Sequence, residues 1–203
     1  HTINPRLSPE QMLYIIEHAG DRLLFVDTTF VPIIEKLIPK LPKNLVIIVM
    51  ASSDDSSTLS DNFLNYEQLI LESSHDIIWP ELPENTAAGL CYTSGTTGNP
   101  KGALYSHRST VLHALTTSLN LGPSLGDGMK VLPVVPLFHV NAWGLPYAAP
   151  LTGTSLIFPG PNLDGASLFD LMDQENVNSA WGVPTVWLGL LEEIRKQERV
   201  PSQ

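Results

Sequence analysis

The sequence predicts an α/β protein in which parallel sheets are flanked by helices. Short apolar runs of strand length alternate along the chain with segments whose apolar residues recur at helical spacing, as in parallel strands joined by crossover helices. The composition agrees, because 43% hydrophobic and 16% charged residues in a chain of 203 suit a packed globular protein.

A capped helix is expected near the start of the chain. Ser8, Pro9 and Gln11 supply a hydroxyl N-cap, a proline in the first turn and a glutamine that completes a capping box, and Gly20 ends the helix. The next expected elements are a strand at 22–27, a helix over 29–41 with strain at Pro39, and a strand at 45–50. The polar run 51–62 is interpreted as a solvated surface loop, with a phosphorylated regulatory loop as the alternative.

The pattern continues in the second half of the chain. The expected strands are 87–93, 103–105, 130–135, 155–158 and 178–181, and the expected helices are 108–121, 140–151, 165–175 and 184–196. Strands and helices that alternate in this way predict further parallel sheet.

Charge and cysteine content exclude several classes of protein. A formal net charge of −10 argues against nucleic-acid binding, which needs a basic face. No apolar run approaches the roughly 20 residues of a membrane-spanning helix. Cys91 is the single cysteine, so a disulfide framework is excluded and we expect a reducing, cytoplasmic location. Because His1 is not an initiator methionine, we expect the chain to begin inside a longer gene product.

The glycine-rich loop (residues 93–102) carries the strongest chemical signal. It follows a predicted strand and combines four hydroxyl side chains, three glycines and one lysine. Glycines allow backbone N–H groups to approach a ligand, and hydroxyls, amides and a lysine can bind phosphate oxygens. The P-loop is an unsuitable alternative, because Pro100 and Gly102 occupy positions that need glycine and serine or threonine, and no helix begins at Lys101.

Residues 90–102 resemble the phosphate-binding signature of the adenylate-forming superfamily. Residues 136–144, with the sequence PLFHVNAWG, resemble the next motif of that superfamily, and Gly182-Val183-Pro184-Thr185 resembles the segment that lines its acyl pocket. Residues 1–7 are similar to the fatty-acyl-CoA synthetase branch, which includes medium- and long-chain acyl-CoA ligases and methylthiopropionate-CoA ligases.

This resemblance implies a partial chain. The whole of residues 1–203 would be a fragment of the large N-terminal AMP-binding domain, with about 1–86 as a first α/β segment and about 87–203 as the segment of the glycine-rich loop and acyl pocket. The C-terminal domain of such enzymes would be absent, so we expect the chain alone to be inactive.

The resemblance also implies a reaction. ATP and a carboxylate would form an acyl-adenylate, and coenzyme A would then displace AMP, with Mg²⁺ on the phosphates. Lys101 would neutralise the departing pyrophosphate and His139 would lie beside the reacting carboxylate, so both are candidate catalytic residues. Thr93 would help to place Mg²⁺. The other phosphate-binding candidates are Ser94, Gly95, Thr96, Thr97 and Gly98.

Aromatic and small residues would line the acyl side of the site. Trp143 would act as a gate that responds to ATP. Trp181, Gly182, Val183 and Pro184 would border the acyl or the adenine side of the pocket, and His139 would also contact the substrate. A packed core histidine and a structural tryptophan are the alternatives for His139 and Trp143. His107, His113 and Trp187 are interpreted as ordinary helix residues.

Three functions are open at this point. The first is an acyl-CoA ligase acting on a fatty acid, the second is an adenylating enzyme with another acceptor, and the third is an inactive nucleotide-binding fragment. The sequence leaves the acyl chain length and the oligomeric state open, including a homodimer.

Overall fold

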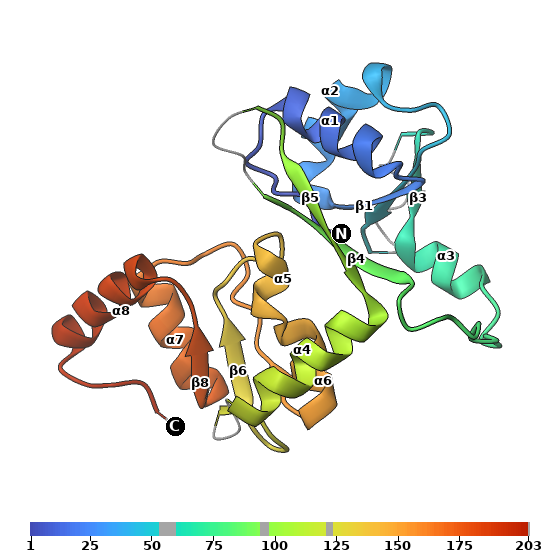
Figure 1. Ribbon diagram of the computed structural model, residues 1–203. Coiled ribbons are helices and arrows are strands. Elements are labelled where there is room, and N and C mark those ends of the chain that lie inside the picture. The colour runs from blue at the N-terminus through green and yellow to red at the C-terminus, as the bar shows by residue number, and fades with distance from the viewer. Residues whose placement is uncertain (53–59, 94–97, 121–123, 203) are drawn as a thin grey trace. The chain divides into compact units, whose positions relative to one another are not determined.

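The computed structural model describes residues 1–52, 60–93, 98–120 and 124–202, and these form two compact units (Figure 1). The N-terminal unit comprises Ile3–Leu82 and Tyr92–Gly102. The C-terminal unit comprises His1–Thr2, Pro83–Cys91 and Ala103–Gln203. Strands β4 (Ala87–Thr93) and β5 (Lys101–Ser106) pair with each other, and the division between the units passes through both strands.

The N-terminal unit is built on a parallel sheet with the order β1-β2-β3. Its strands are β1 (Leu23–Asp27), β2 (Val46–Met50) and β3 (Phe63–Asn65), and its helices are α1 (Pro9–Ala19), α2 (Val31–Leu37) and α3 (Tyr66–Glu72). Its core contains Met12 of α1, Ile34 and Leu37 of α2, and Val26 and Val49 of the sheet. Helices α1 and α2 therefore pack on one face of the sheet.

Helix α1 begins and ends as its sequence predicts. The Ser8 hydroxyl accepts a hydrogen bond from the Gln11 N–H, and the Gln11 side chain accepts one from the Ser8 N–H, each at 3.3 Å. Gly20 has a φ of 69° and ends the helix in the left-handed conformation. Ile15 and Ile16 are only 1% exposed and Met12 packs in the core of the unit, so the helix buries several apolar side chains.

The C-terminal unit is a three-layer structure around the parallel sheet β7-β6-β8. Its strands are β6 (Lys130–Pro133), β7 (Ser155–Leu156) and β8 (Ser179–Trp181), and its helices are α4 (His107–Asn120), α5 (Val140–Trp143), α6 (Leu145–Thr152), α7 (Gly165–Glu175) and α8 (Pro184–Gln197). Successive β6 residues point to opposite faces: Val131 packs with the cluster of α4 and α6, and Leu132 packs with the cluster that includes α7 and α8. Both side chains are 0% exposed, and each such burial contributes roughly 1.5–3 kcal/mol.

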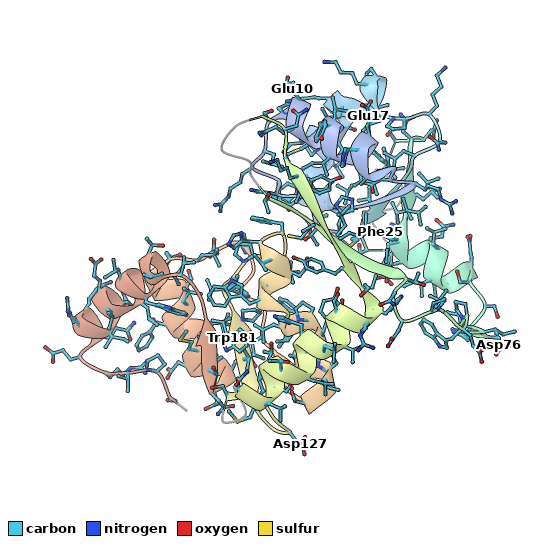
Figure 2. All side chains as sticks on the ribbon, viewed as in Figure 1. Glu10, Glu17, Phe25, Asp76, Asp127 and Trp181 are labelled. Atoms are coloured by element: carbon cyan, nitrogen blue, oxygen red, sulfur yellow. The ribbon has the colours of Figure 1, made fainter. Side chains whose placement is uncertain are left out.

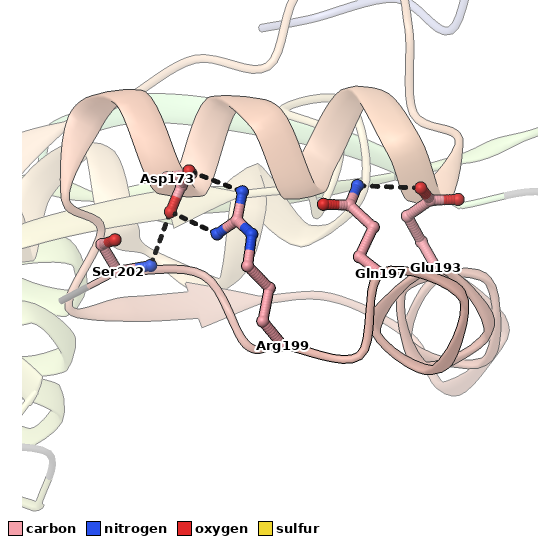
Figure 3. Close-up of polar contacts among 5 residues, drawn as sticks. All are labelled: Asp173, Glu193, Gln197, Arg199 and Ser202. Carbon is pink, nitrogen blue, oxygen red and sulfur yellow. Dashed lines mark hydrogen bonds and ion pairs between the residues drawn. The ribbon is translucent and has the colours of Figure 1, made fainter.

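Polar contacts tie the segment after α8 back to α7 (Figure 3). The Arg199 guanidinium donates two hydrogen bonds of 3.0 Å to the Asp173 carboxylate, and the Ser202 N–H donates a third of 2.8 Å. Arg199 also lies over the Phe169 ring, 4.6 Å from its centroid. These hydrogen bonds hold the pKa of Asp173 well below its ordinary range, and the contact with Arg199 makes the largest contribution.

The fold class is confirmed, but two predicted helices are interrupted. The helix expected over 29–41 consists of 3₁₀ turns at Thr28–Phe30 and Ile38–Lys40 around α2. Pro39 lies inside the second 3₁₀ turn, where its missing N–H and its ring oppose a continuous α-helix. The helix expected over 140–151 is divided at Gly144, which has a φ of 81°.

Two short elements were not predicted, and two strands are shorter than expected. Strand β3 and helix α3 follow the polar run 51–62, of which residues 53–59 lie outside the described part of the chain. The strand expected at 130–135 ends at Pro133, and the strand expected at 155–158 ends at Leu156. In the described part of the chain, no helix combines the length and the apolar composition that a bilayer crossing requires.

Candidate active site

The candidate residues are divided between the two units. Thr93, Gly98 and Lys101 belong to the N-terminal unit. His139, Trp143, Trp181, Gly182, Val183 and Pro184 belong to the C-terminal unit. Ser94, Gly95, Thr96 and Thr97 lie outside the described residues.

The ends of the glycine-rich loop are joined at the base of the loop. Thr93 ends β4 and Lys101 begins β5, and the Thr93 hydroxyl donates a hydrogen bond of 3.4 Å to the Lys101 carbonyl. Both side chains are exposed, so a hydroxyl and an ammonium group are accessible at the two ends of the loop. Gly98 has a φ of 93°, which favours glycine although a Cβ there would meet open space.

A side-chain pair outside the predicted site meets the start of this loop. Nδ1 of His18 lies 2.7 Å from the Tyr92 hydroxyl, and Tyr92 directly precedes Thr93. Neither residue was predicted as part of the site, because the pair spans 74 positions and no local pattern relates His18 to Tyr92, although Tyr92 lies within the signature at 90–102.

His139 stands before an unusual backbone turn. Val140, Asn141, Ala142 and Trp143 all have φ between 47° and 57°, so α5 is a left-handed turn that Gly144 continues. Left-handed conformations cost roughly 1–2 kcal/mol per non-glycine residue, so the surrounding structure must hold the turn in place. The Ala142 N–H donates to the His139 carbonyl at 3.1 Å, and the fully buried Ala142 side chain anchors the middle of the turn.

The segment that leads into this turn is tied to the strand before the loop. The Cys91 thiol of β4 donates a hydrogen bond of 3.7 Å to the Phe138 carbonyl, next to His139. The Thr2 hydroxyl donates one of 2.9 Å to the Leu137 carbonyl. These contacts position the backbone of His139, whose side chain is exposed.

The turn places Trp143 beside Trp181. Their ring centroids are 6.4 Å apart and the planes are inclined by 36°. Trp181 ends β8, and its carbonyl accepts hydrogen bonds from the Val134 and Val135 N–H groups at 2.8 and 3.0 Å (Figure 2 labels Trp181). Trp143 remains 38% exposed, so the pair presents apolar aromatic surface.

The residues after Trp181 form the start of α8. Val183 is its N-cap residue and Pro184 lies in its first turn. A Cβ added to Gly182 would lie 2.8 Å from the Trp187 ring, so glycine allows the backbone to pass close to that indole. Trp187 is packed in the apolar cluster beneath, as expected for an ordinary helix residue.

The described residues contain no group of three or more His, Cys, Asp or Glu side chains that could hold a metal ion. Among the loop residues that the structure describes, Thr93 offers a hydroxyl oxygen. Mg²⁺ keeps several waters and is commonly bound by one or two protein groups together with phosphates. A hydroxyl oxygen such as that of Thr93 is a ligand type that suits Mg²⁺ bound mainly by phosphates and waters.

Comparison with known proteins identifies relatives over nearly the whole chain. The family described as AMP-binding enzyme matches residues 1–202. A medium-chain-fatty-acid–CoA ligase of Ectopseudomonas oleovorans is 52% identical over 192 residues, which cover 94% of this chain and 35% of that protein. A 3-methylmercaptopropionyl-CoA ligase of Ruegeria pomeroyi is 48% identical over 198 residues, covering 96% of this chain and 36% of the relative.

The fold is also similar to that of solved structures. A crystal structure of an anthranilate CoA ligase in complex with anthranoyl-AMP superposes with a TM-score of 0.77 at 24% identity, covering 93% of this chain and 36% of the other. The chain thus spans about a third of the length of the relatives that it matches. On the extent of the family match and the identity to these ligases, the chain belongs to the AMP-binding enzyme family.

Proposed function

We propose that the full-length gene product activates a carboxylic acid with ATP to an acyl-adenylate and then transfers the acyl group to coenzyme A. The observation that carries the proposal is the glycine-rich loop between β4 and β5, with exposed Thr93 and Lys101 at its two ends. Its hydroxyls, glycines and lysine suit a triphosphate, because charge stabilisation and positioning dominate the transfer of such groups.

Each candidate residue would have a separate role in the reaction. Lys101 would neutralise the departing pyrophosphate, and Thr93 would help to place Mg²⁺. Ser94, Gly95, Thr96, Thr97 and Gly98 would bind the phosphates. His139 would orient the carboxylate beside the α-phosphate, since its imidazole can donate a hydrogen bond near pH 7.

The substrate is proposed to be a fatty acid or a short thioether acid. Trp143 and Trp181 present aromatic surface in the C-terminal unit and suit an apolar acyl chain, with Gly182, Val183 and Pro184 at its border. The names of the two ligases above, one for a medium-chain fatty acid and one for 3-methylmercaptopropionate, support this range. A cytoplasmic location stays a prediction, and a homodimer is one of the oligomeric states that the sequence leaves open.

ATP–pyrophosphate exchange in the full-length gene product tests the first step. The acids would run from propionate to octadecanoate, with 3-methylmercaptopropionate included. Exchange with one class of acid supports the proposal and identifies the substrate. If no acid supports exchange, the proposal is wrong and the inactive nucleotide-binding alternative is favoured.

The acceptor is tested separately. AMP release that depends on coenzyme A supports the ligase, whereas exchange without coenzyme A-dependent AMP release would favour an adenylating enzyme with another acceptor. The same assays on the 203-residue chain should show no turnover, as expected for a third of the relatives' length.

A further inference from the structure

The pair His18 and Tyr92 joins helix α1 to the strand that leads into the glycine-rich loop. Nδ1 of His18 lies 2.7 Å from the Tyr92 hydroxyl, and the two rings meet edge to face with centroids 5.8 Å apart. Tyr92 is the residue before Thr93, so this contact lies at the point where the chain enters the loop.

The end of β4 depends on contacts of this kind. Among the described residues, β4 and β5 form a two-stranded sheet, and such a pair is marginally stable by itself. The Thr93–Lys101 hydrogen bond joins the two ends of the loop to each other but to no other element. The His18–Tyr92 contact instead connects the loop entrance to the body of the N-terminal unit.

Helix α1 is a rigid support for that contact. His18 lies in its last turn, on a helix whose Ile15 and Ile16 are buried and whose two ends are capped. The Tyr14 ring stacks on the His18 ring with centroids 5.2 Å apart, which restricts the motion of the imidazole. Burial raises the pKa of Tyr92, and the neighbouring Asp21 carboxylate adds to the effect, so the phenol keeps its proton and can donate to Nδ1.

We propose that His18 is a positioning residue for nucleotide binding: through Tyr92 it holds the entrance of the glycine-rich loop in the place where the loop can bind the triphosphate of ATP. The inference rests on the proposed function, because it assumes that the loop binds ATP. His18 itself touches no substrate and acts through Tyr92.

The choice of side chain at position 18 gives a sharp test. Asparagine places an amide nitrogen or oxygen near the position of Nδ1, so His18→Asn keeps the hydrogen bond. Glutamine extends its amide toward the position of Nε2, so His18→Gln does not restore it, and His18→Leu removes it. Tyr92→Phe removes the same bond from the other side, and Tyr66→Phe, on α3, is the matched loss of a hydroxyl in the same unit.

Three constants are measured in the full-length gene product: the Kd for MgATP by calorimetry without acid, and the KM for MgATP and the KM for the acid in pyrophosphate exchange. We expect His18→Leu, His18→Gln and Tyr92→Phe to raise the Kd and KM for MgATP about three- to tenfold, as for one net hydrogen bond. The KM for the acid should not change, and His18→Asn and Tyr66→Phe should resemble the unsubstituted protein. The double variant His18→Leu/Tyr92→Phe should be no weaker than either single variant.

The outcomes separate this inference from the proposed function. The positioning role would be overturned if substitutions at position 18 left the Kd and KM for MgATP unchanged. It would also be overturned if they weakened MgATP binding, weakened acid binding and lowered the thermal midpoint to the same degree. If the protein showed no pyrophosphate exchange but bound MgATP more weakly in the His18 variants, the proposed function would be refuted and the positioning role supported. Absent MgATP binding in the unsubstituted protein would refute both.

Discussion

The imidazole ring of His113 lies against the backbone of Gly144. A Cβ added to Gly144 would be 2.5 Å from two atoms of that ring. Gly144 has a φ of 81° and follows directly on the left-handed turn that carries Trp143. Helix α4, through His113, therefore packs closely against the point at which the chain leaves this turn and begins α6.

Gly144→Ala should destabilise the protein by about 2–4 kcal/mol, because it adds backbone strain to steric overlap with His113. Gly153→Ala is the matched control: Gly153 has a φ of 73°, but its added Cβ would have ordinary contacts, the nearest at 3.6 Å. The control should show the strain alone, a loss of about 1–2 kcal/mol in chemical denaturation.

The double variant Gly144→Ala/His113→Ala separates the two contributions. Removal of the ring should recover the difference between the Gly144 and Gly153 variants and leave the strain. Equal losses in Gly144→Ala and Gly153→Ala would show that the imidazole moves aside at no cost, and would contradict a fixed contact.

The Asp173–Arg199 pair should make stability depend on pH in acid. The folded pKa of Asp173 lies below its ordinary value of 3.8, so the contribution of the pair is complete above that value and is lost as the pH falls through the folded pKa. The difference in denaturation midpoint between the unsubstituted protein and Asp173→Asn should be constant near neutral pH and should shrink below about pH 4.

Arg199→Lys is the companion to this experiment. Lysine keeps the charge but cannot make the two-pronged contact with the carboxylate, so an intermediate loss at neutral pH is expected. A pH-independent difference between Asp173→Asn and the unsubstituted protein would show that the effect has another source.

Local sequence patterns were sufficient to predict an element whose ends are marked by its own capping residues. Ser8, Gln11 and Gly20 predicted both ends of α1, because caps depend on neighbouring residues. The prediction of a helix over 140–151 from its sequence pattern was wrong, because four consecutive non-glycine residues there have positive φ. Such a conformation opposes residue preference, so contacts such as the burial of Ala142 must stabilise it.

In the candidate site, too, local motifs were predicted from the sequence and long-range contacts were not. Resemblance over short motifs identified the glycine-rich loop and Trp143, but no pattern in the residues relates Trp143 to Trp181 or His18 to Tyr92. These contacts join elements that are far apart in the chain, and they depend on how helices and strands pack rather than on local spacing. Strand β3 was missed for a related reason, because three residues are too few to show a period.

Lys101→Ala in the full-length gene product should reduce the rate of adenylation at least about 100-fold, the usual effect of removing one preorganised charge-stabilising group. Lys101 is exposed at the first position of β5, so the thermal midpoint should change little. Lys36→Ala, an exposed lysine in the last turn of α2, is the matched control and should leave turnover unchanged. Normal turnover in Lys101→Ala would refute the assignment of the loop to the phosphates.

His139→Ala should affect the chemical step rather than the binding of ATP. The exposed His139 precedes a turn whose backbone is held by Ala142, so removal of the imidazole should leave the turn in place. We expect kcat to fall about 100-fold while the Kd for MgATP changes less than about threefold, because an orienting donor acts mainly in the transition state. His75→Ala, an exposed histidine of the N-terminal unit, controls for the loss of an imidazole. If His139→Ala instead weakened MgATP binding and kept kcat, His139 would belong to nucleotide binding, and the orientation of the carboxylate would have to come from another residue.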